Sequence, residues 1–184
     1  MMTTLVLGGA RSGKSVYAEM LAIESGREVV YIATAHASDS EMALRIAHHQ
    51  RARPPHWQTV EEPLQLSAAI ASHAHPSRLV LVDCLTLWLS NLLFSDGREY
   101  PEVGLIELPA RFGIERSALL DVLRDPGGEV ILVSNEVGMG IMPLGAVTRC
   151  FVDEAGRLNQ AVAAICDRVV LVAAGLPLVM KGVP

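Results

Sequence analysis

Cysteine is scarce in this sequence, and its spacing excludes two classes of protein. The chain of 184 residues has three cysteines, an odd number, each set among apolar neighbours. Such spacing argues against a disulfide framework and against a metal cluster. We therefore expect reduced, buried thiols of a cytosolic protein. The three residues are Cys84, Cys150 and Cys166.

A positive net charge and a membrane-spanning segment are also lacking. The formal net charge is −5, from 15 basic and 20 acidic side chains, which argues against a nucleic-acid partner. The longest apolar run, 79–93, is interrupted by polar residues, so we expect no membrane span. Residues 1–4 have no basic flank and lead straight into a predicted strand. We expect no signal peptide and a cytoplasmic location.

Lysine is the rarest basic residue, and one of only two lies in the most informative segment. The chain has thirteen arginines but only Lys14 and Lys181. Residues 8–15 match the phosphate-binding loop pattern G-x-x-x-x-G-K-[ST], which arises by chance in roughly one chain per hundred of this length. The residues that we predict to bind nucleotide phosphates are Gly8, Gly9, Ala10, Arg11, Ser12, Gly13, Lys14 and Ser15.

The residue types of this loop suit phosphate chemistry. Glycines let successive backbone N–H groups and the following helix N-terminus face phosphate oxygens. Lys14 would reach the outer phosphates, and the hydroxyl of Ser15 would ligate Mg²⁺. The alternative is a glycine-rich turn with an exposed lysine. The predicted strand before the loop and the predicted helix after it favour the phosphate site.

Alternation of short apolar runs with longer helical patterns predicts the fold class. It is α/β: a single P-loop NTPase domain over residues 1–184, RecA-like, with a mostly parallel sheet and helices on both faces. We predict strands at 3–7, 29–33, 79–83, 129–134 and 168–173, with weaker ones at 57–60 and 177–181. Helices are predicted at 14–24, 39–52, 63–73, 85–94, 105–124 and 146–165.

Ligands of parallel sheets bind at the carboxyl ends of the strands, so polar residues there are site candidates. Asp83 ends an apolar strand in the Walker B arrangement that holds Mg²⁺ directly or through water; a helix cap is the alternative. Thr34 lies between two alanines that would let a nucleotide approach the backbone, or ends a strand without a ligand. Asn135 and Glu136 end another strand. Glu136 could orient a substrate hydroxyl or a metal-bound water, or cap a helix.

Two adjacent histidines lie near the end of the predicted helix 39–52. Cationic residues in the last turn of a helix favour a capping role for His48 and His49 on pattern alone. Their neighbours change this interpretation, because RIAHH from Arg45, NEVGMG from Asn135 and AGRLNQ from Ala155 occur together with the phosphate loop. Read in order, these segments resemble the bifunctional adenosylcobinamide kinase and adenosylcobinamide-phosphate guanylyltransferases of cobalamin biosynthesis. The resemblance covers nearly the whole chain.

The resemblance implies two successive reactions. GTP or ATP gives its γ-phosphoryl group to the aminopropanol hydroxyl of adenosylcobinamide, and GMP from GTP is then transferred to that phosphate through a guanylyl-histidine. His48 falls on the nucleophile's position, where a neutral imidazole can attack the α-phosphorus, and Lys14 assists. The resemblance further implies Mg²⁺ at Ser15 and Asp83. It implies nucleotide contacts at Ala33, Thr34, Ala35, His49, Gln50, Arg51, Ala52, Glu61 and Asp83.

Departures from the family pattern and two other functions remain open at this point. The family usually has an acidic residue and then polar or basic ones where this chain has Leu144, Gly145 and Ala146, and an arginine at Val152. Those positions bear on corrinoid fit or on the homotrimer that the resemblance implies. The competing functions are a one-step P-loop kinase with a structural His48 and a GTP-binding regulatory module.

Overall fold

The computed structural model describes residues 2–35 and 54–183, and the predicted helix 39–52 lies outside these ranges. The described strands are β1 (Thr3–Gly8), β2 (Glu28–Ala33), β3 (Gln58–Glu61), β4 (Arg78–Asp83), β5 (Glu129–Asn135), β6 (Arg168–Ala173) and β7 (Leu176–Lys181). The helices are α1 (Lys14–Glu24), α3 (Leu66–His73), α4 (Leu85–Phe94), α5 (Ala110–Arg124) and α6 (Ala146–Ile165).

One seven-stranded sheet contains all the described strands, in the order β3-β2-β4-β5-β1-β6-β7. Every neighbouring pair is parallel except β6 and β7, which pair antiparallel through a short turn. The mostly parallel sheet agrees with the prediction. Because the six parallel strands point the same way, the loops after β1, β2, β3, β4 and β5 meet along one edge.

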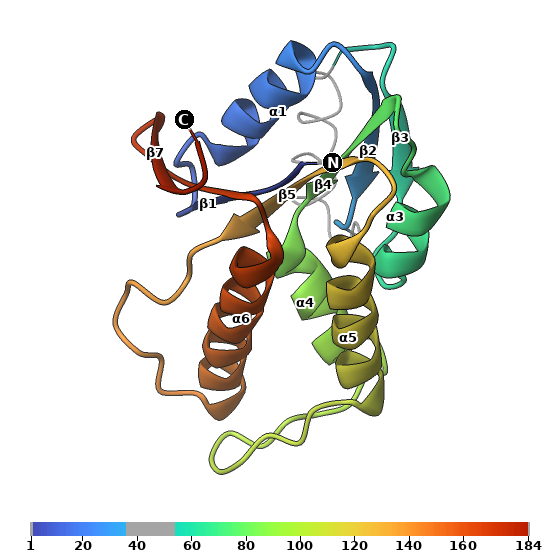
Figure 1. The fold of residues 1–184 in the computed structure, drawn as a ribbon. Helices are drawn as coiled ribbons and strands as arrows, with labels where there is room; N and C mark the ends of the chain where they lie inside the picture. Colours follow the sequence, from blue (N-terminus) through green and yellow to red (C-terminus); the bar gives the residue numbers. More distant parts are fainter. Residues whose placement is uncertain (1, 36–53, 184) are drawn as a thin grey trace.

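Each face of the sheet has its own hydrophobic core. Successive strand residues face opposite sides, so Leu5 and Val82 pack under α3, α4, α5 and α6, while Val6 and Leu81 pack under α1. Figure 1 shows α1 on one side of the sheet and the other four helices on the opposite side. The expectation of helices on both faces is confirmed. Within residues 2–35 and 54–183, no helix combines the length and apolarity needed to cross a membrane.

Most predicted elements are found within a residue or two, but two helices begin later than expected. The helix predicted at 105–124 begins at Ala110, because Pro109 disfavours helical backbone in the residue before it and stands at the N-cap. The helix predicted at 63–73 begins at Leu66. There the Glu62 carboxylate accepts the N–H groups of Leu64 and Gln65, at 2.9 and 2.8 Å, which sets the first turn.

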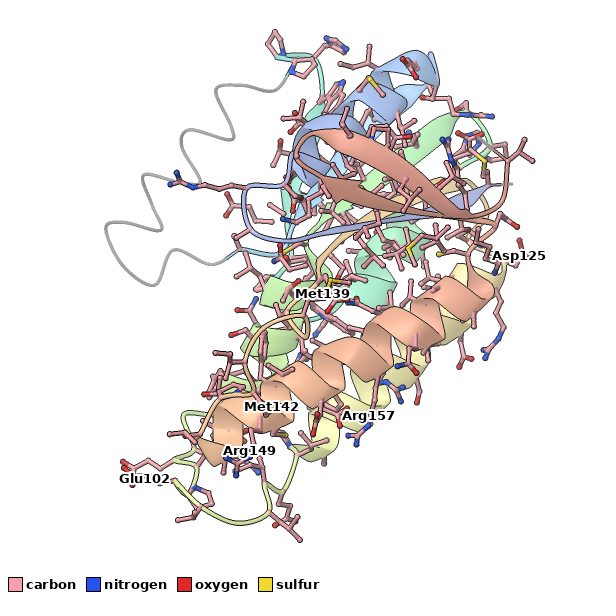
Figure 2. All side chains as sticks on the ribbon, turned by 90° about the vertical axis from the view of Figure 1, so that its left-hand side faces the viewer. Glu102, Asp125, Met139, Met142, Arg149 and Arg157 are labelled. Atoms are coloured by element: carbon pink, nitrogen blue, oxygen red, sulfur yellow. The ribbon has the colours of Figure 1, made fainter. Side chains whose placement is uncertain are left out.

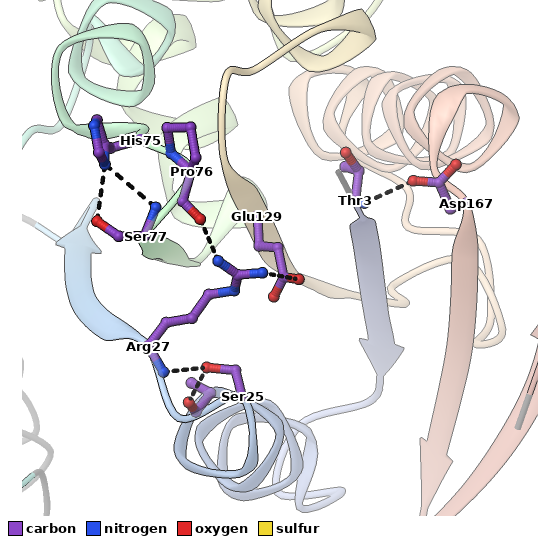
Figure 3. Close-up of polar contacts among 9 residues, drawn as sticks. Thr3, Ser25, Arg27, His75, Pro76, Ser77, Glu129 and Asp167 are labelled. Carbon is purple, nitrogen blue, oxygen red and sulfur yellow. Dashed lines mark hydrogen bonds and ion pairs between the residues drawn. The ribbon is translucent and has the colours of Figure 1, made fainter.

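Polar contacts fasten the edge of the sheet at the amino ends of the strands (Figure 3). Arg27, which follows α1, donates to the carbonyl of Pro76 and to the Glu129 carboxylate, the latter at 3.1 Å. At the other side of this edge, the Thr3 N–H donates to Asp167 Oδ2 at 2.8 Å. These contacts tie the connections before β2, β4 and β5 together and leave the opposite edge to the loops that carry the predicted site.

Candidate functional site

The predicted phosphate loop joins the end of β1 to the beginning of α1. Gly13 has a φ of 94° and Arg11 a φ of 57°, so the backbone turns through the left-handed region twice. Glycine adopts this conformation without strain, whereas Arg11 does so against the usual preference of a side chain with a Cβ. The Tyr17 N–H donates to the Gly13 carbonyl at 3.0 Å, which is the first turn of α1. The loop therefore ends at a helix N-terminus, where anions are favoured.

Two neighbouring segments hold the phosphate loop through backbone hydrogen bonds. The Gly8 carbonyl accepts the N–H of Glu136 at 3.0 Å, and the Ser12 carbonyl accepts the N–H of Gly175 at 2.8 Å. A Cβ on Gly8 would lie 2.6 Å from the Val172 carbonyl oxygen, so only glycine fits there. The loop is thus held by β5 on one side and by the β6–β7 turn on the other.

Lys14 begins α1 and folds back over the loop. Its ammonium donates to the Gly9 carbonyl at 3.2 Å, and the residue is partly buried. A lysine on the first turn of the helix brings a positive charge to the helix N-terminus at which the loop ends. The arrangement is suited to a phosphate chain, with Lys14 as its counter-charge.

Asp83 stands at the end of β4, two strands away from β1 in the sheet. The Tyr31 hydroxyl donates to its Oδ2 at 3.0 Å. The helix that follows, α4, has Cys84 at its N-cap with no side-chain capping bond, so Asp83 does not serve as a helix cap. The geometry removes that alternative and leaves a half-buried carboxylate oriented by a tyrosine at the carboxyl edge of the sheet.

Thr34, predicted to lie beside a nucleotide, is fully buried, and its side chain is used within the protein. The hydroxyl donates to the Cys84 carbonyl at 2.7 Å and accepts the Cys84 N–H at 2.8 Å. Asn91 donates to the Thr34 carbonyl at 2.7 Å. Contacts of this segment with a nucleotide would therefore come from Ala33 and Ala35. The role of Thr34 seen here is to join the ends of β2 and β4.

The buried thiol beside Asp83 is strongly perturbed. Burial raises the pKa of Cys84 to about 11, and the negative charge of Asp83 adds to the rise. Cys166 is also buried, and burial raises its pKa to about 12. The expectation of three buried thiols is wrong for Cys150, which is only partly buried on α6. Its position on the helix surface leaves one side open.

Asn135 is the last residue of β5, which lies between β1 and β4, and Glu136 follows it. The Asn135 N–H donates to the hydroxyl of Thr86 at 2.7 Å, which ties β5 to the beginning of α4. Asn159 of α6 accepts the buried Ser134 hydroxyl at 2.7 Å and donates to the Asn135 carbonyl at 3.2 Å. The Asn135 end of β5 is thus held from two helices at once.

Glu136 does not cap a helix, because the next one, α6, begins ten residues later at Ala146. Its carboxylate accepts the Gly138 N–H at 2.8 Å, and its own N–H is the donor to Gly8. The side chain therefore lies at the junction of the phosphate loop and the segment after β5.

Glu61 ends β3 at the far edge of the sheet from the phosphate loop. Four strand spacings separate β3 from β1, which is roughly 19 Å at about 4.8 Å per strand. The predicted nucleotide contacts therefore form one row along the carboxyl edge instead of a compact cluster. His48, His49, Gln50, Arg51 and Ala52 lie outside the described residues, so their prediction stays as made.

Three residues of this edge were not predicted from the sequence. They are Tyr31, Asn159 and Gly175, which hold Asp83, Asn135 and the phosphate loop respectively. The alternation of strand residues could have placed Tyr31 on the same face as Asp83, since Ala33 is paired with Asp83. The other two depend on which elements become neighbours, which no local pattern encodes.

Metal ligation by protein groups alone is not seen in the described ranges. Within residues 2–35 and 54–183, no group of three or more histidine, cysteine, aspartate or glutamate side chains could hold an ion. The predicted oxygen ligands are the Ser15 hydroxyl and the Asp83 carboxylate. This set fits Mg²⁺, which is commonly bound by one or two protein oxygens together with substrate phosphates.

Comparison with known proteins shows the family of the chain. The family model "Cobinamide kinase / cobinamide phosphate guanyltransferase" matches residues 4–180. The bifunctional adenosylcobalamin biosynthesis protein CobP of Pseudomonas aeruginosa is 54% identical, covering 100% of this chain and 99% of that one. CobU of Escherichia coli is 42% identical, covering 98% and 100%.

A solved structure gives the same fold. A prototypical ATPase from the type III secretion system of pathogenic bacteria has a TM-score of 0.55 at 11% identity, covering 97% of this chain and 56% of that one. This likeness concerns the fold alone. With the sheet order and the loop geometry, it confirms the P-loop NTPase fold class of RecA-like type.

Proposed function

The chain belongs to the cobinamide kinase / cobinamide phosphate guanyltransferase family, and from this premise we propose that it catalyses both reactions. The first phosphorylates the aminopropanol hydroxyl of adenosylcobinamide, and the second transfers GMP to the new phosphate, giving adenosylcobinamide-GDP in cobalamin biosynthesis. The observation that carries the proposal is the phosphate loop at β1, held by Glu136 of the β5 end and placed at the same sheet edge as Asp83.

In the kinase step, the loop and Lys14 hold the triphosphate. The loop's N–H groups and the Lys14 ammonium face charge that builds on the phosphate oxygens as the γ-phosphoryl group moves. Glu136 stands beside the loop, where it would orient the attacking hydroxyl. Either GTP or ATP can serve this step, because these groups contact only phosphates.

In the transfer step, a nitrogen of the neutral His48 imidazole attacks the α-phosphorus of GTP. A P–N bond forms as the bond to pyrophosphate breaks. An oxygen of the phosphate of adenosylcobinamide phosphate then attacks the same phosphorus, forming a P–O bond as the P–N bond breaks. The imidazole leaves with the ring N–H that it kept throughout, so His48 is again neutral. Ala33, Ala35 and Glu61 at the β2 and β3 ends, with His49, Gln50, Arg51 and Ala52, would hold the guanine nucleotide.

Mg²⁺ is part of the proposal, with Ser15 and Asp83 as its protein ligands, directly or through water. When bound, it would neutralise phosphate charge. The protein's own contribution is the orientation of the Asp83 carboxylate by Tyr31, seen at 3.0 Å. An oriented ligand needs less rearrangement when the ion arrives.

The proposal extends to organisation and location. We place residues 1–184 in one catalytic domain, supported by the single sheet that runs from Thr3 to Lys181. A cytoplasmic location suits three cysteines without disulfides. A homotrimer is consistent with the large apolar side chains exposed on edge strand β7, Leu176, Leu178 and Met180, which self-association would cover.

Product analysis tests the proposal. The purified protein is incubated with Mg²⁺, adenosylcobinamide and GTP labelled at either the α- or the γ-phosphate, and the corrinoids are separated. We expect γ-label in adenosylcobinamide phosphate and α-label in adenosylcobinamide-GDP. A one-step kinase would give only the first product. A regulatory GTP-binding module would give neither, and either result contradicts the proposal.

A further inference from the structure

Four large apolar side chains stand in solvent on the segment that joins β5 to α6, residues 137–145, hereafter the β5–α6 segment. Met139, Ile141 and Leu144 are 80%, 100% and 92% exposed, and Met142 is 54% exposed. Figure 2 shows Met139 toward the sheet and Met142 farther along, toward Arg149 on α6. Four such side chains within nine residues of chain are candidates for a surface that a ligand covers.

Hydrogen bonds hold this segment at both ends, so its exposed side chains are not on a loose tail. At its beginning, the Glu136 N–H donates to the Gly8 carbonyl of the phosphate loop at 3.0 Å. At its end, the Arg149 guanidinium donates to the carbonyls of Pro143 and Leu144. These exposed side chains therefore belong to a segment that is anchored beside the phosphate loop at its beginning and on α6 at its end.

The backbone of the segment offers polar groups between these side chains. In the part of the chain that the structure describes, no backbone N–H of residues 139–142 or 144 donates a hydrogen bond. A ligand that presents apolar area together with hydrogen-bond acceptors would complement this segment. Two of the four side chains are methionines, whose unbranched, polarisable chains adapt to irregular ligand shapes.

We propose that the corrin ring of adenosylcobinamide lies on the β5–α6 segment, an inference that rests on the proposed function. The corrin ring is a broad macrocycle with an apolar, methyl-bearing framework and carboxamide arms around its rim. Its framework would cover Met139, Ile141 and Met142, and its carboxamide oxygens would accept the unpartnered backbone N–H groups. Ring and surface are complementary in both respects.

The reach of the substrate favours this location. The reacting hydroxyl is joined to the ring by seven bonds of a propionamide and aminopropanol arm, roughly 9 Å when extended. The ring must therefore bind within about one arm length of the γ-phosphate. Met139 is three residues from Glu136, whose N–H contacts the phosphate loop, so it lies within roughly 11 Å of that contact. A second copy of the chain is the other candidate occupant of this segment. Its binding would not require the segment to lie near the phosphate loop.

Paired glutamine substitutions test the inference. The double variant Met139→Gln/Ile141→Gln removes apolar character at fully solvated positions, so folding should be kept. The control is Ile114→Gln on α5, another large apolar side chain exposed to 67%. For each protein, the Kd of adenosylcobinamide is measured by equilibrium dialysis. We also measure the KM for adenosylcobinamide and the KM for GTP. Two further measurements are self-labelling by α-labelled GTP without corrinoid and the mass of the protein in solution.

We expect the double variant to raise the Kd and KM for adenosylcobinamide roughly tenfold, with GTP kinetics, self-labelling and mass unchanged. Ile114→Gln should leave all of these unchanged. An unaltered corrinoid Kd would overturn the inference, as would a changed mass, which would assign the surface to a second copy. Wild-type protein that labels itself with GTP but never binds adenosylcobinamide would refute the inference while sparing the histidine chemistry. Absence of both activities would refute the proposed function as well.

Discussion

The hydroxyl of Tyr31 on β2 donates a hydrogen bond of 3.0 Å to Oδ2 of Asp83 on β4. Tyr31 is almost fully buried, whereas Asp83 is partly open at the edge of the sheet. The bond leaves the other carboxylate oxygen for a ligand and sets its direction. Tyr31 is therefore a positioning residue for the proposed Mg²⁺ site, acting through Asp83.

Removing this hydroxyl should weaken the response to Mg²⁺. Tyr31→Phe is expected to raise the Mg²⁺ concentration for half-maximal activity about tenfold, within the range found when outer partners of metal ligands are lost. High Mg²⁺ should restore kcat. The matched control is Tyr17→Phe, whose hydroxyl accepts a hydrogen bond from the Arg168 guanidinium of β6 at 3.1 Å. Identical Mg²⁺ titrations for wild type and Tyr31→Phe would contradict this role.

The two lysines offer a direct comparison. Lys14→Gln should lower kcat/KM about 10²–10³-fold in both the kinase and the GMP-transfer reactions. The reason is that the ammonium that would offset the negative charge of the phosphates is lost. Lys181→Gln is the control, since its ammonium donates to the carbonyls of Ala163 and Ala164 at the end of α6. Steady-state kinetics of each step would decide. A Lys14→Gln enzyme that kept either reaction at full rate would show that the loop does not serve that step.

The buried pair Ser134 and Asn159 should be coupled in stability. Asn159→Leu leaves the Ser134 hydroxyl buried without its acceptor, so we expect a loss of about 1–3 kcal/mol in the free energy of unfolding. Adding Ser134→Ala should recover part of that loss, because there is then no Ser134 hydroxyl left without its acceptor. Urea unfolding of the two single variants and the double variant measures the coupling. Strict additivity would mean that the 2.7 Å contact contributes nothing.

The buried thiol of Cys84 should make stability fall at alkaline pH. Burial raises its pKa from 9.0 to about 11, so between these values the unfolded chain loses a proton that the folded chain keeps. Each such thiol then lowers the free energy of unfolding by about 1.4 kcal/mol per pH unit. Cys84→Ala should reduce the mean slope between pH 9 and 10.5 by about 1 kcal/mol per pH unit, because each thiol is partly ionised at one end of this window. Parallel curves for variant and wild type would contradict the raised pKa.

Local sequence patterns predicted the helices and strands well, but they did not predict the contacts between these elements. The helices 14–24, 85–94 and 146–165 were predicted with their observed bounds, because apolar periodicity and adjacent turns define both ends. The start of α5 at Ala110 was missed since Pro109 outweighed the apolar residues before it. The location of Asp83 at a strand end was predictable. Its bond to Tyr31 was not, because it requires β2 and β4 to be neighbours.

Self-labelling of the protein by GTP tests the central claim most directly. Wild type and His48→Ala are incubated with Mg²⁺ and α-labelled or γ-labelled GTP, without corrinoid, and the denatured protein is treated with acid or base. The account predicts acid-labile, base-stable label on wild type from α-labelled GTP alone, none on His48→Ala, and loss of GMP transfer in that variant. Full α-labelling of His48→Ala, or formation of the GDP-linked corrinoid by that variant at the wild-type rate, would contradict it.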